Sequence, residues 1–302
     1  MPTQFIPLIP ILLTFCFILY ALGLKIVTQK KLKKGRRNPL TKDLLRNPGE
    51  SLRQQVAELD FDLAGDYFGL IFLPCSCFLT LVSQGIAQSK EITISSIIVV
   101  TVVAGVAVVY LSHRIISHIH KRNNLRLGLE CELAVGEELT QLMLLGCRVF
   151  HDFPGENFNI DHVIIGPNGV FAVETKGRAK PDKGRGKEDV RVVYNGKSLQ
   201  FPGWTETEPI VQAKRQAQWL ANWLKDVVGQ PVPVKPALAL PGWFIDRQGR
   251  DMVVFNSKKP EFLATPRGER VLSDEMIQRA AYQVEQRCRT VEPLSFCKVK
   301  GE

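Results

Sequence analysis

A short apolar stretch carries charged side chains whose spacing suits metal-assisted hydrolysis. The sequence "NIDHVIIGPNGVFAVETKG", residues 159–177, has Asp161 near its start and Glu174 and Lys176 near its end. Two carboxylates offer the hard oxygen ligands that Mg²⁺ prefers, and a lysine beside a metal-bound water could help to deprotonate or orient it. Phosphodiester hydrolysis needs this combination of a Lewis acid, an aligned water and positive charge where negative charge develops.

A β-hairpin is the element that must position these side chains. The runs "IDHVII" and "VFAVET" are rich in β-formers, and "GPNG" between them supplies turn residues. A turn at the Pro-Asn pair places Asp161 opposite Glu174, whereas a turn one residue later places it opposite Lys176. Directly opposed residues share a face, as do residues two apart, so in both registers the three charged side chains point the same way. His162 points to the other face, where we interpret it as a packed histidine.

The segment 125–143 adds a fourth charged residue to this set. Its apolar residues form one helical stripe, and Glu132 lies in the middle of the stripe. A carboxylate on the core-facing side of a helix is costly unless it is paired or bound to a metal. We therefore expect a helix followed by three strands, with Glu132, Asp161, Glu174 and Lys176 as the inward polar set.

The segment from about 127 to 220 resembles the NERD domain, a nuclease-related domain of the PD-(D/E)XK, restriction-endonuclease-like superfamily. The quoted stretch resembles the most recognisable motif of that family. The resemblance implies catalytic roles for Asp161, Glu174 and Lys176, with Asp161 and Glu174 as ligands of Mg²⁺ or Mn²⁺. It also implies an α/β fold in which a restriction-endonuclease-like mixed sheet is flanked by helices.

Two further positions follow from the same resemblance, each beside a departure from the family pattern. The family's helical Gly-Glu pair falls on Cys131 and Glu132, so the acid is retained and the glycine is not. The family's Pro-x-x-Gln falls on Pro209 and Gln212, preceded by Glu208 where the family has Asn. Pro209 suits the first turn of a helix. A site role and a surface role for Gln212 both remain open.

A basic stretch follows the hairpin. Residues 176–191, "KGRAKPDKGRGKEDVR", hold seven basic and three acidic residues among Gly and Pro, the composition of a loop. Such a loop can hold a phosphodiester backbone by charge, and a solvated surface loop is the alternative. The residues that we expect to contact nucleic acid are Lys180, Lys183, Arg185 and Lys187.

Three uncharged apolar stretches, 6–24, 67–87 and 92–111, are each about 20 residues long, the length that crosses a bilayer core. A cleaved signal peptide is the alternative for the first stretch, and a buried β segment for the third. The stretch 25–66 holds 10 basic and 6 acidic residues, while the "QSKE" between the second and third stretches is nearly neutral. We therefore expect this basic loop to be cytoplasmic.

These patterns predict a membrane region, 1–112, and a cytoplasmic nuclease domain, 113–302, with a C-terminal extension. The predicted protein is a multi-pass protein of the inner (plasma) membrane that hydrolyses nucleic acid, with DNA favoured over RNA. A non-catalytic, membrane-tethered module that binds nucleic acid or acts as a scaffold is the alternative. A transporter is disfavoured because the spans carry no charge. The seven cysteines show no spacing typical of zinc ligands, so we interpret them as reduced thiols.

Neutralising Lys180, Lys183, Arg185 and Lys187 together is expected to weaken nucleic-acid binding and to flatten its dependence on salt. Each lost phosphate contact removes roughly one counterion from the slope of log K against log salt concentration. Fluorescence anisotropy across a salt series measures that slope. A slope equal to that of the parent would leave the basic stretch as an ordinary solvated loop.

Overall fold

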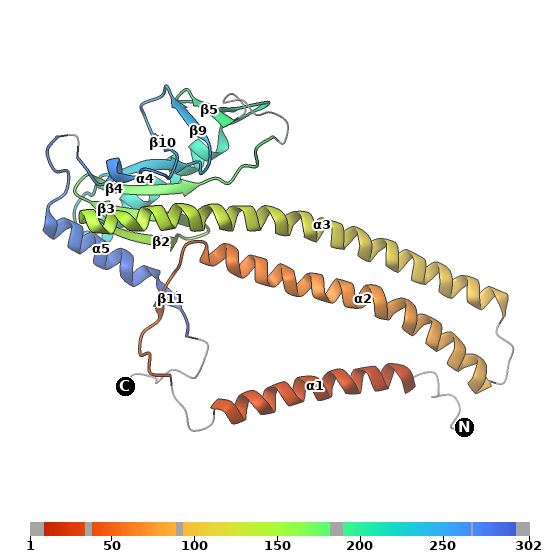
Figure 1. The fold of residues 1–302 in the computed structure, drawn as a ribbon. Helices are drawn as coiled ribbons and strands as arrows, with labels where there is room; N and C mark the ends of the chain where they lie inside the picture. The colour runs from red at the N-terminus through yellow and green to blue at the C-terminus, as the bar shows by residue number, and fades with distance from the viewer. Residues whose placement is uncertain (1–8, 34–37, 89–92, 182–189, 267, 294–302) are drawn as a thin grey trace. The chain divides into compact units, whose positions relative to one another are not determined.

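The computed structural model describes residues 9–33, 38–88, 93–181, 190–266 and 268–293, which form two compact units (Figure 1). The helical unit comprises residues 1–41, 56–123 and 293–302, and the α/β unit comprises residues 42–55 and 124–292. The α/β unit thus contains a short segment, 42–55, from the stretch that the sequence assigns to a loop of the membrane region.

The helical unit is built from α1 (Ile9–Lys33) and from most of α2 (Glu50–Gln88) and α3 (Ile94–Thr140). Within this unit, Arg122 pairs with Asp60, and Arg114 lies 2.9 Å from Asp66. These ion pairs lie outside the predicted spans 67–87 and 92–111, so they do not bring charge into the bilayer core, where it is costly.

Two helices among the described residues are long and apolar enough to cross a membrane, namely Glu50–Ile86 and Ile94–Leu145. They contain residues 67–86 and 94–111 of the predicted spans 67–87 and 92–111. Only 6% and 0% of their most apolar windows are buried within the structure, which argues against core helices of a water-soluble domain. The predicted span 6–24 falls largely on α1, which is not among the two, and its first residues lie outside the described part. That first span stays a prediction.

A mixed five-stranded sheet is the centre of the α/β unit. Its strand order is β10-β8-β4-β3-β2, with antiparallel pairing from β2 to β4 and parallel pairing of β4, β8 and β10. The strands are β2 (Arg148–Pro154), β3 (Asn159–Gly166), β4 (Gly169–Thr175), β8 (Val234–Ala239) and β10 (Val253–Phe255). A mixed sheet between helices agrees with the predicted α/β class.

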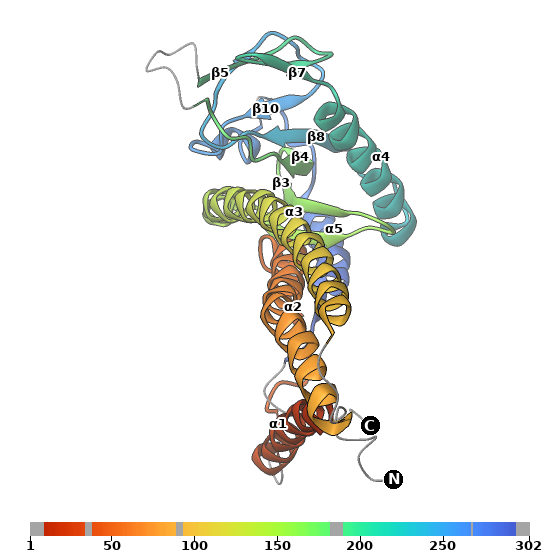
Figure 2. The ribbon, with the colours of Figure 1, turned by 90° about the vertical axis from the view of Figure 1, so that its right-hand side faces the viewer.

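Helices cover both faces of this sheet. α4 (Glu208–Val228) and α5 (Asp274–Cys288) bury their apolar stripes against one face through residues such as Leu220 and Val284. The last turns of α3 and the short helix η2 (Gln141–Leu145) cover the other face through Leu139 and Leu142. Figure 2 shows α4 beside β8 and β4. Because helices cover both faces, the central strands carry hydrophobic residues at successive positions and not in alternation.

A second, four-stranded sheet has its own core around the fully buried side chains of Trp243 and Tyr194. Its order is β7-β6-β5-β9, from β5 (Arg191–Tyr194), β6 (Leu199–Phe201), β7 (Trp204–Glu206) and β9 (Phe244–Arg247). The turn between β5 and β6 contains Gly196 at φ +93°, a conformation that glycine adopts readily. The Asn-Gly pair thus lies in the turn of a second antiparallel hairpin, β5–β6, as such pairs commonly do.

The sheet register decides between the two predicted turns of the first hairpin. Gly166 pairs with Gly169 and His162 pairs with Val173, so Pro167 and Asn168 form the turn. This is the register in which Asp161 is opposite Glu174. The β2–β3 register passes from His151↔His162 to Phe153↔Ile160 and skips the position of Asp161. Asp152, the residue on β2 at that skipped position, has φ +49°, which breaks the regular strand there.

The α/β unit contains chain from both sides of the two candidate spans. β1 (Leu44–Leu45) precedes α2 and pairs with β11 (Arg289–Val291), which lies far beyond α3. The segments before α2 and after α3 therefore share one compartment, so any membrane crossings between them must be even in number.

A reporter-fusion map of the full chain is expected to place a tag after residue 302 in the cytoplasm and a tag near residue 88 outside. The basic stretch 25–66 belongs inside by the distribution of Lys and Arg. A C-terminal tag outside would contradict the orientation. A cytoplasmic tag near residue 88 would contradict the crossing by α2 and α3.

Candidate active site

The end of β4 carries a buried carboxylate, Glu174, that contacts two polar side chains. Glu174 is 2% exposed, and its Oε1 lies 2.5 Å from Nζ of Lys176. Its Oε2 accepts a hydrogen bond of 2.7 Å from Nε2 of Gln216, on α4. Lys176 also donates to Oε1 of Gln212 at 3.1 Å. Both carboxylate oxygens of Glu174 are thus held in place, and Lys176 is held between β4 and α4.

Asp161 enters the same site from β3. Its Oδ2 accepts a 2.6 Å hydrogen bond from the backbone N–H of Thr175, which stabilises the carboxylate at the end of the β3–β4 ladder. Burial, followed by the charges of Glu174 and Glu132, raises the pKa of Asp161 well above its ordinary range. The Thr175 hydrogen bond and Lys176 lower it. Asp161 is therefore electrostatically coupled to both other acids.

Glu132 brings a third carboxylate from α3. The residue is 8% exposed. Burial, and then the charges of Asp152 and Glu174, raise the pKa of Glu132 to about 8. Lys176 and a hydrogen bond from the backbone of Gly49 act in the opposite direction. Because burial and mutual repulsion disfavour their charged forms, Glu132 and Asp161 take up protons more readily than free carboxyl groups unless a cation lies beside them.

This donor set fits a divalent cation. Clustered carboxylates that raise one another's pKa are stabilised in their charged form by a nearby positive ion. Among the described residues, no group of three or more His, Cys, Asp or Glu side chains is arranged to hold a metal ion. Mg²⁺, however, commonly takes one or two carboxylates and keeps several waters or binds substrate oxygens. Asp161 and Glu174 supply two such carboxylates.

The segment 127–241 matches the model of a family described as the nuclease-related domain, NERD. This segment is similar to NERD domains. It contains β2, β3, β4 and α4, and all five residues that the sequence nominates as catalytic lie within it. Comparisons with curated proteins and with solved structures gave no match.

The structure brings the predicted residues of the NERD site together and leaves His162 apart. Glu132, Asp161, Glu174, Lys176 and Gln212 all take part in the contacts or charge interactions described above. His162 is fully buried, with Nδ1 2.9 Å from Nδ1 of His151. The prediction of a packed histidine is confirmed.

Gln216 is the neighbour of Glu174 that sequence reasoning missed. Its side chain is 1% exposed and also donates to the backbone oxygen of Asn159 at 3.1 Å. A signal was present, because Gln216 lies one helical turn after Gln212 and so shares its face of α4. The signal is weak, because Gln216 lies among the apolar residues of that helix, and a glutamine at the edge of an apolar stripe is usually read as a surface residue.

The two departures from the family pattern each have a local setting in the NERD domain. Cys131 is half-buried, and a Cβ added to Gly177 would lie 2.8 Å from its sulfur, so Gly177 leaves room for the larger side chain. Glu208 is exposed in the first turn of α4, where the helix dipole favours an acid. Neither residue removes a contact of the carboxylate cluster.

The predicted nucleic-acid contacts lie mostly beyond the described residues. Lys183, Arg185 and Lys187 fall in 182–189, outside the described part. Lys180 is exposed, with Nζ 5.9 Å from the centre of the Trp243 ring. Trp243 itself is fully buried in the core of the second sheet.

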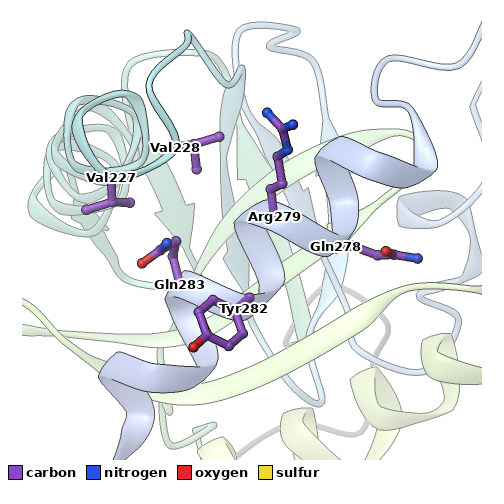
Figure 3. A pocket seen from close by; sticks show the side chains of 6 residues that line it. All are labelled: Val227, Val228, Gln278, Arg279, Tyr282 and Gln283. Atoms are coloured by element: carbon purple, nitrogen blue, oxygen red, sulfur yellow. The ribbon is translucent and has the colours of Figure 1, made fainter.

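A surface hollow of about 580 Å³ lies elsewhere in the α/β unit, between the end of α4 and α5 (Figure 3). Its lining is Val227, Val228, Gln278, Arg279, Tyr282 and Gln283. None of these is a carboxylate, and the only cation, Arg279, pairs with Glu275 at 2.7 Å. The hollow lacks the groups that hydrolysis requires.

Replacing Gln216 by Met is expected to destabilise the NERD domain. Methionine has a similar volume but leaves Oε2 of the buried Glu174 without its donor, at a cost of about 1–3 kcal/mol. For a domain of this size, the thermal midpoint of the detergent-solubilised chain should fall by about 2–4 °C for each kcal/mol. Gln218→Met, on the exposed side of the same helix, is the matched control. Equal midpoints for the two variants would contradict this role of Gln216.

Proposed function

We propose that the chain is a membrane-anchored, metal-dependent nuclease that hydrolyses phosphodiester bonds, with DNA as its substrate. One observation carries the proposal: buried Glu174 is held by Lys176 and Gln216 beside Asp161, within a NERD domain. A structural ion pair would explain Glu174 and Lys176 alone. It would not explain two further carboxylates, Asp161 and Glu132, whose buried charge is costly without a cation.

Each residue of the cluster has a role that follows from its contacts. Asp161 and Glu174 would hold Mg²⁺ or Mn²⁺, which when bound polarises a phosphoryl oxygen and makes its water more acidic. Lys176, fixed by Glu174 and Gln212, presents its ammonium group to the developing negative charge and to the attacking water. Its side chain is 22% exposed, so it reaches the solvent from which a substrate arrives. Glu132 supplies the third carboxylate behind the two ligands.

The location of the domain limits its substrates. With α2 and α3 crossing the inner membrane and the α/β unit in the cytoplasm, the nuclease would act only on nucleic acid near the inner face. Such tethering restricts its action without any need to recognise base sequence. The net charge of +9 favours a polyanionic partner.

Purified full-length protein in detergent tests the proposal when it is incubated with labelled DNA and RNA, with Mg²⁺ or with EDTA. We expect the parent to cleave DNA only when the metal is present. Glu174→Gln should reduce the rate by about 10²-fold or more, since a neutral amide is a poor ligand for Mg²⁺. Glu137→Gln, which changes an exposed acid of α3, is the matched control and should cleave at the parent rate.

Two results would count against the nuclease. Cleavage by Glu174→Gln at the parent rate would remove Glu174 from the catalytic machinery. A parent and variant that bind DNA equally, and that cleave neither DNA nor RNA with any divalent metal, would favour the non-catalytic binding module.

A further inference from the structure

A segment before the second helix is built into the nuclease unit although it lies outside the family match at 127–241. This segment, Lys42–Gln55, begins with β1, which pairs with β11. The backbone N–H of Arg46 also donates to the carbonyl oxygen of Cys288 at 3.0 Å. The segment is thus bound to the α/β unit at its start and leads into α2 at its end.

A buried ion pair fixes the middle of the segment beside the active site. Nε and Nη2 of Arg46 donate to Oδ2 of Asp152 at 2.9 and 2.5 Å, and Ser51 donates to the same carboxylate from its backbone N–H at 2.9 Å. The hydroxyl of Ser51 in turn accepts from the amide of Asn159. Because the carbonyl oxygen of Asn159 accepts from Gln216, which donates to Glu174, these contacts reach the catalytic cluster.

The turn at Pro48 and Gly49 packs closely against α3. Gly49 has φ +67°, and a Cβ added there would collide with Leu129 and lie 3.6 Å from Oε2 of Glu132. A Cβ on Gly136, one turn beyond Glu132, would lie 2.6 Å from Cγ of Pro48. The turn and the helix therefore approach as closely as they do because both contacting positions are glycine.

Glu132 needs such a support. Its carboxylate is buried, and the charges of Asp152 and Glu174 repel it. A backbone N–H is a donor that stabilises the charged form without bringing a mobile side chain. Gly49 approaches this carboxylate closely, because a Cβ added to Gly49 would lie 3.6 Å from Oε2 of Glu132. The backbone of Gly49 also lowers the pKa of Glu132. The contact of Gly49 with Leu129 and that of Pro48 with Gly136 fix the position of the turn along α3.

We propose that the Lys42–Gln55 segment completes the active site, with the Pro48–Gly49 turn as the positioning element that holds the carboxylate of Glu132. The inference rests on the proposed nuclease function and adds to it a part of the chain that the family match does not cover. A NERD domain cut from this protein at residue 113 or 127 would lack the support of one of its acids. The helix that begins in this segment, α2, is also a candidate membrane span.

The test uses the full-length chain in detergent and the variant Gly49→Ala, which adds the Cβ that collides with Leu129. We expect kcat for DNA cleavage to fall about tenfold or more with KM changed less than twofold, because small displacements of a catalytic group act on the chemical step. Hydrogen exchange of the α3 peptide 127–140 should increase, since that peptide loses its contact with the turn.

Gly229→Ala is the matched control. Gly229 has φ +84°, as strained for alanine as Gly49, but nothing lies within 4 Å of an added Cβ. We expect this variant to keep the parent kcat and the parent exchange of 127–140, which separates backbone strain from loss of the contact. Gly136→Ala disturbs the same contact from the α3 side and should reproduce the effects of Gly49→Ala.

The proposal is overturned if Gly49→Ala leaves the exchange of 127–140 at the parent value. It is equally overturned if exchange increases while cleavage continues at the parent rate, because the turn would then hold α3 without acting on catalysis. A parent that cleaves nothing defeats the proposed function instead. In that case the exchange comparison alone decides whether the turn holds Glu132.

Discussion

Three carboxylates that share a partly buried site with one ammonium group are the constraint on which the rest of the α/β unit depends. Glu132, Asp161 and Glu174 come from α3, β3 and β4, and each raises the cost of charging another. The chain offsets this cost with directed donors: Lys176 and Gln216 for Glu174, and the backbone N–H of Thr175 for Asp161. The charged forms of Glu132 and Asp161 remain disfavoured within the chain, and a nearby cation would stabilise them.

An irregularity in the sheet keeps a fourth acid, Asp152, away from Asp161. A regular antiparallel pair would place Asp161 opposite Asp152 across β2 and β3, but the register skips that position. With φ +49° at Asp152, its carboxylate meets Arg46 and Ser51. Asp161 instead accepts a hydrogen bond from the backbone N–H of Thr175 at the end of β4. One local break in a strand thus separates two acids, of which one becomes structural and the other joins the site.

The two long helices connect the site along the chain to the two candidate membrane spans. α2 begins within the α/β unit and α3 ends within it, and both carry apolar stretches that the structure leaves unburied. Glu132 lies on α3 beyond its apolar stretch. One continuous helix, α3, therefore carries both a candidate membrane span and an acid of the carboxylate cluster.

Sequence by itself determined the local features of this protein. The β-formers around "GPNG" predicted the hairpin, and the two-residue period of a strand put Glu174 and Lys176 on one face. The helical stripe around Glu132 identified a core-facing acid. The motif around Asp161 gave the family, which the match at 127–241 confirms. These features were readable because each depends on residues close together in the chain.

Tertiary structure alone decided the turn register and the contacts between residues that are far apart in the sequence. Both hairpin registers satisfied the same pattern of side chains, and only packing of the sheet selected the one in which Asp161 is opposite Glu174. Arg46 lies 106 residues from Asp152, and the Lys42–Gln55 segment reads as part of a basic loop in the sequence. No periodicity links such distant positions, because their contact is set by how helices and sheet pack and not by the geometry of any one element.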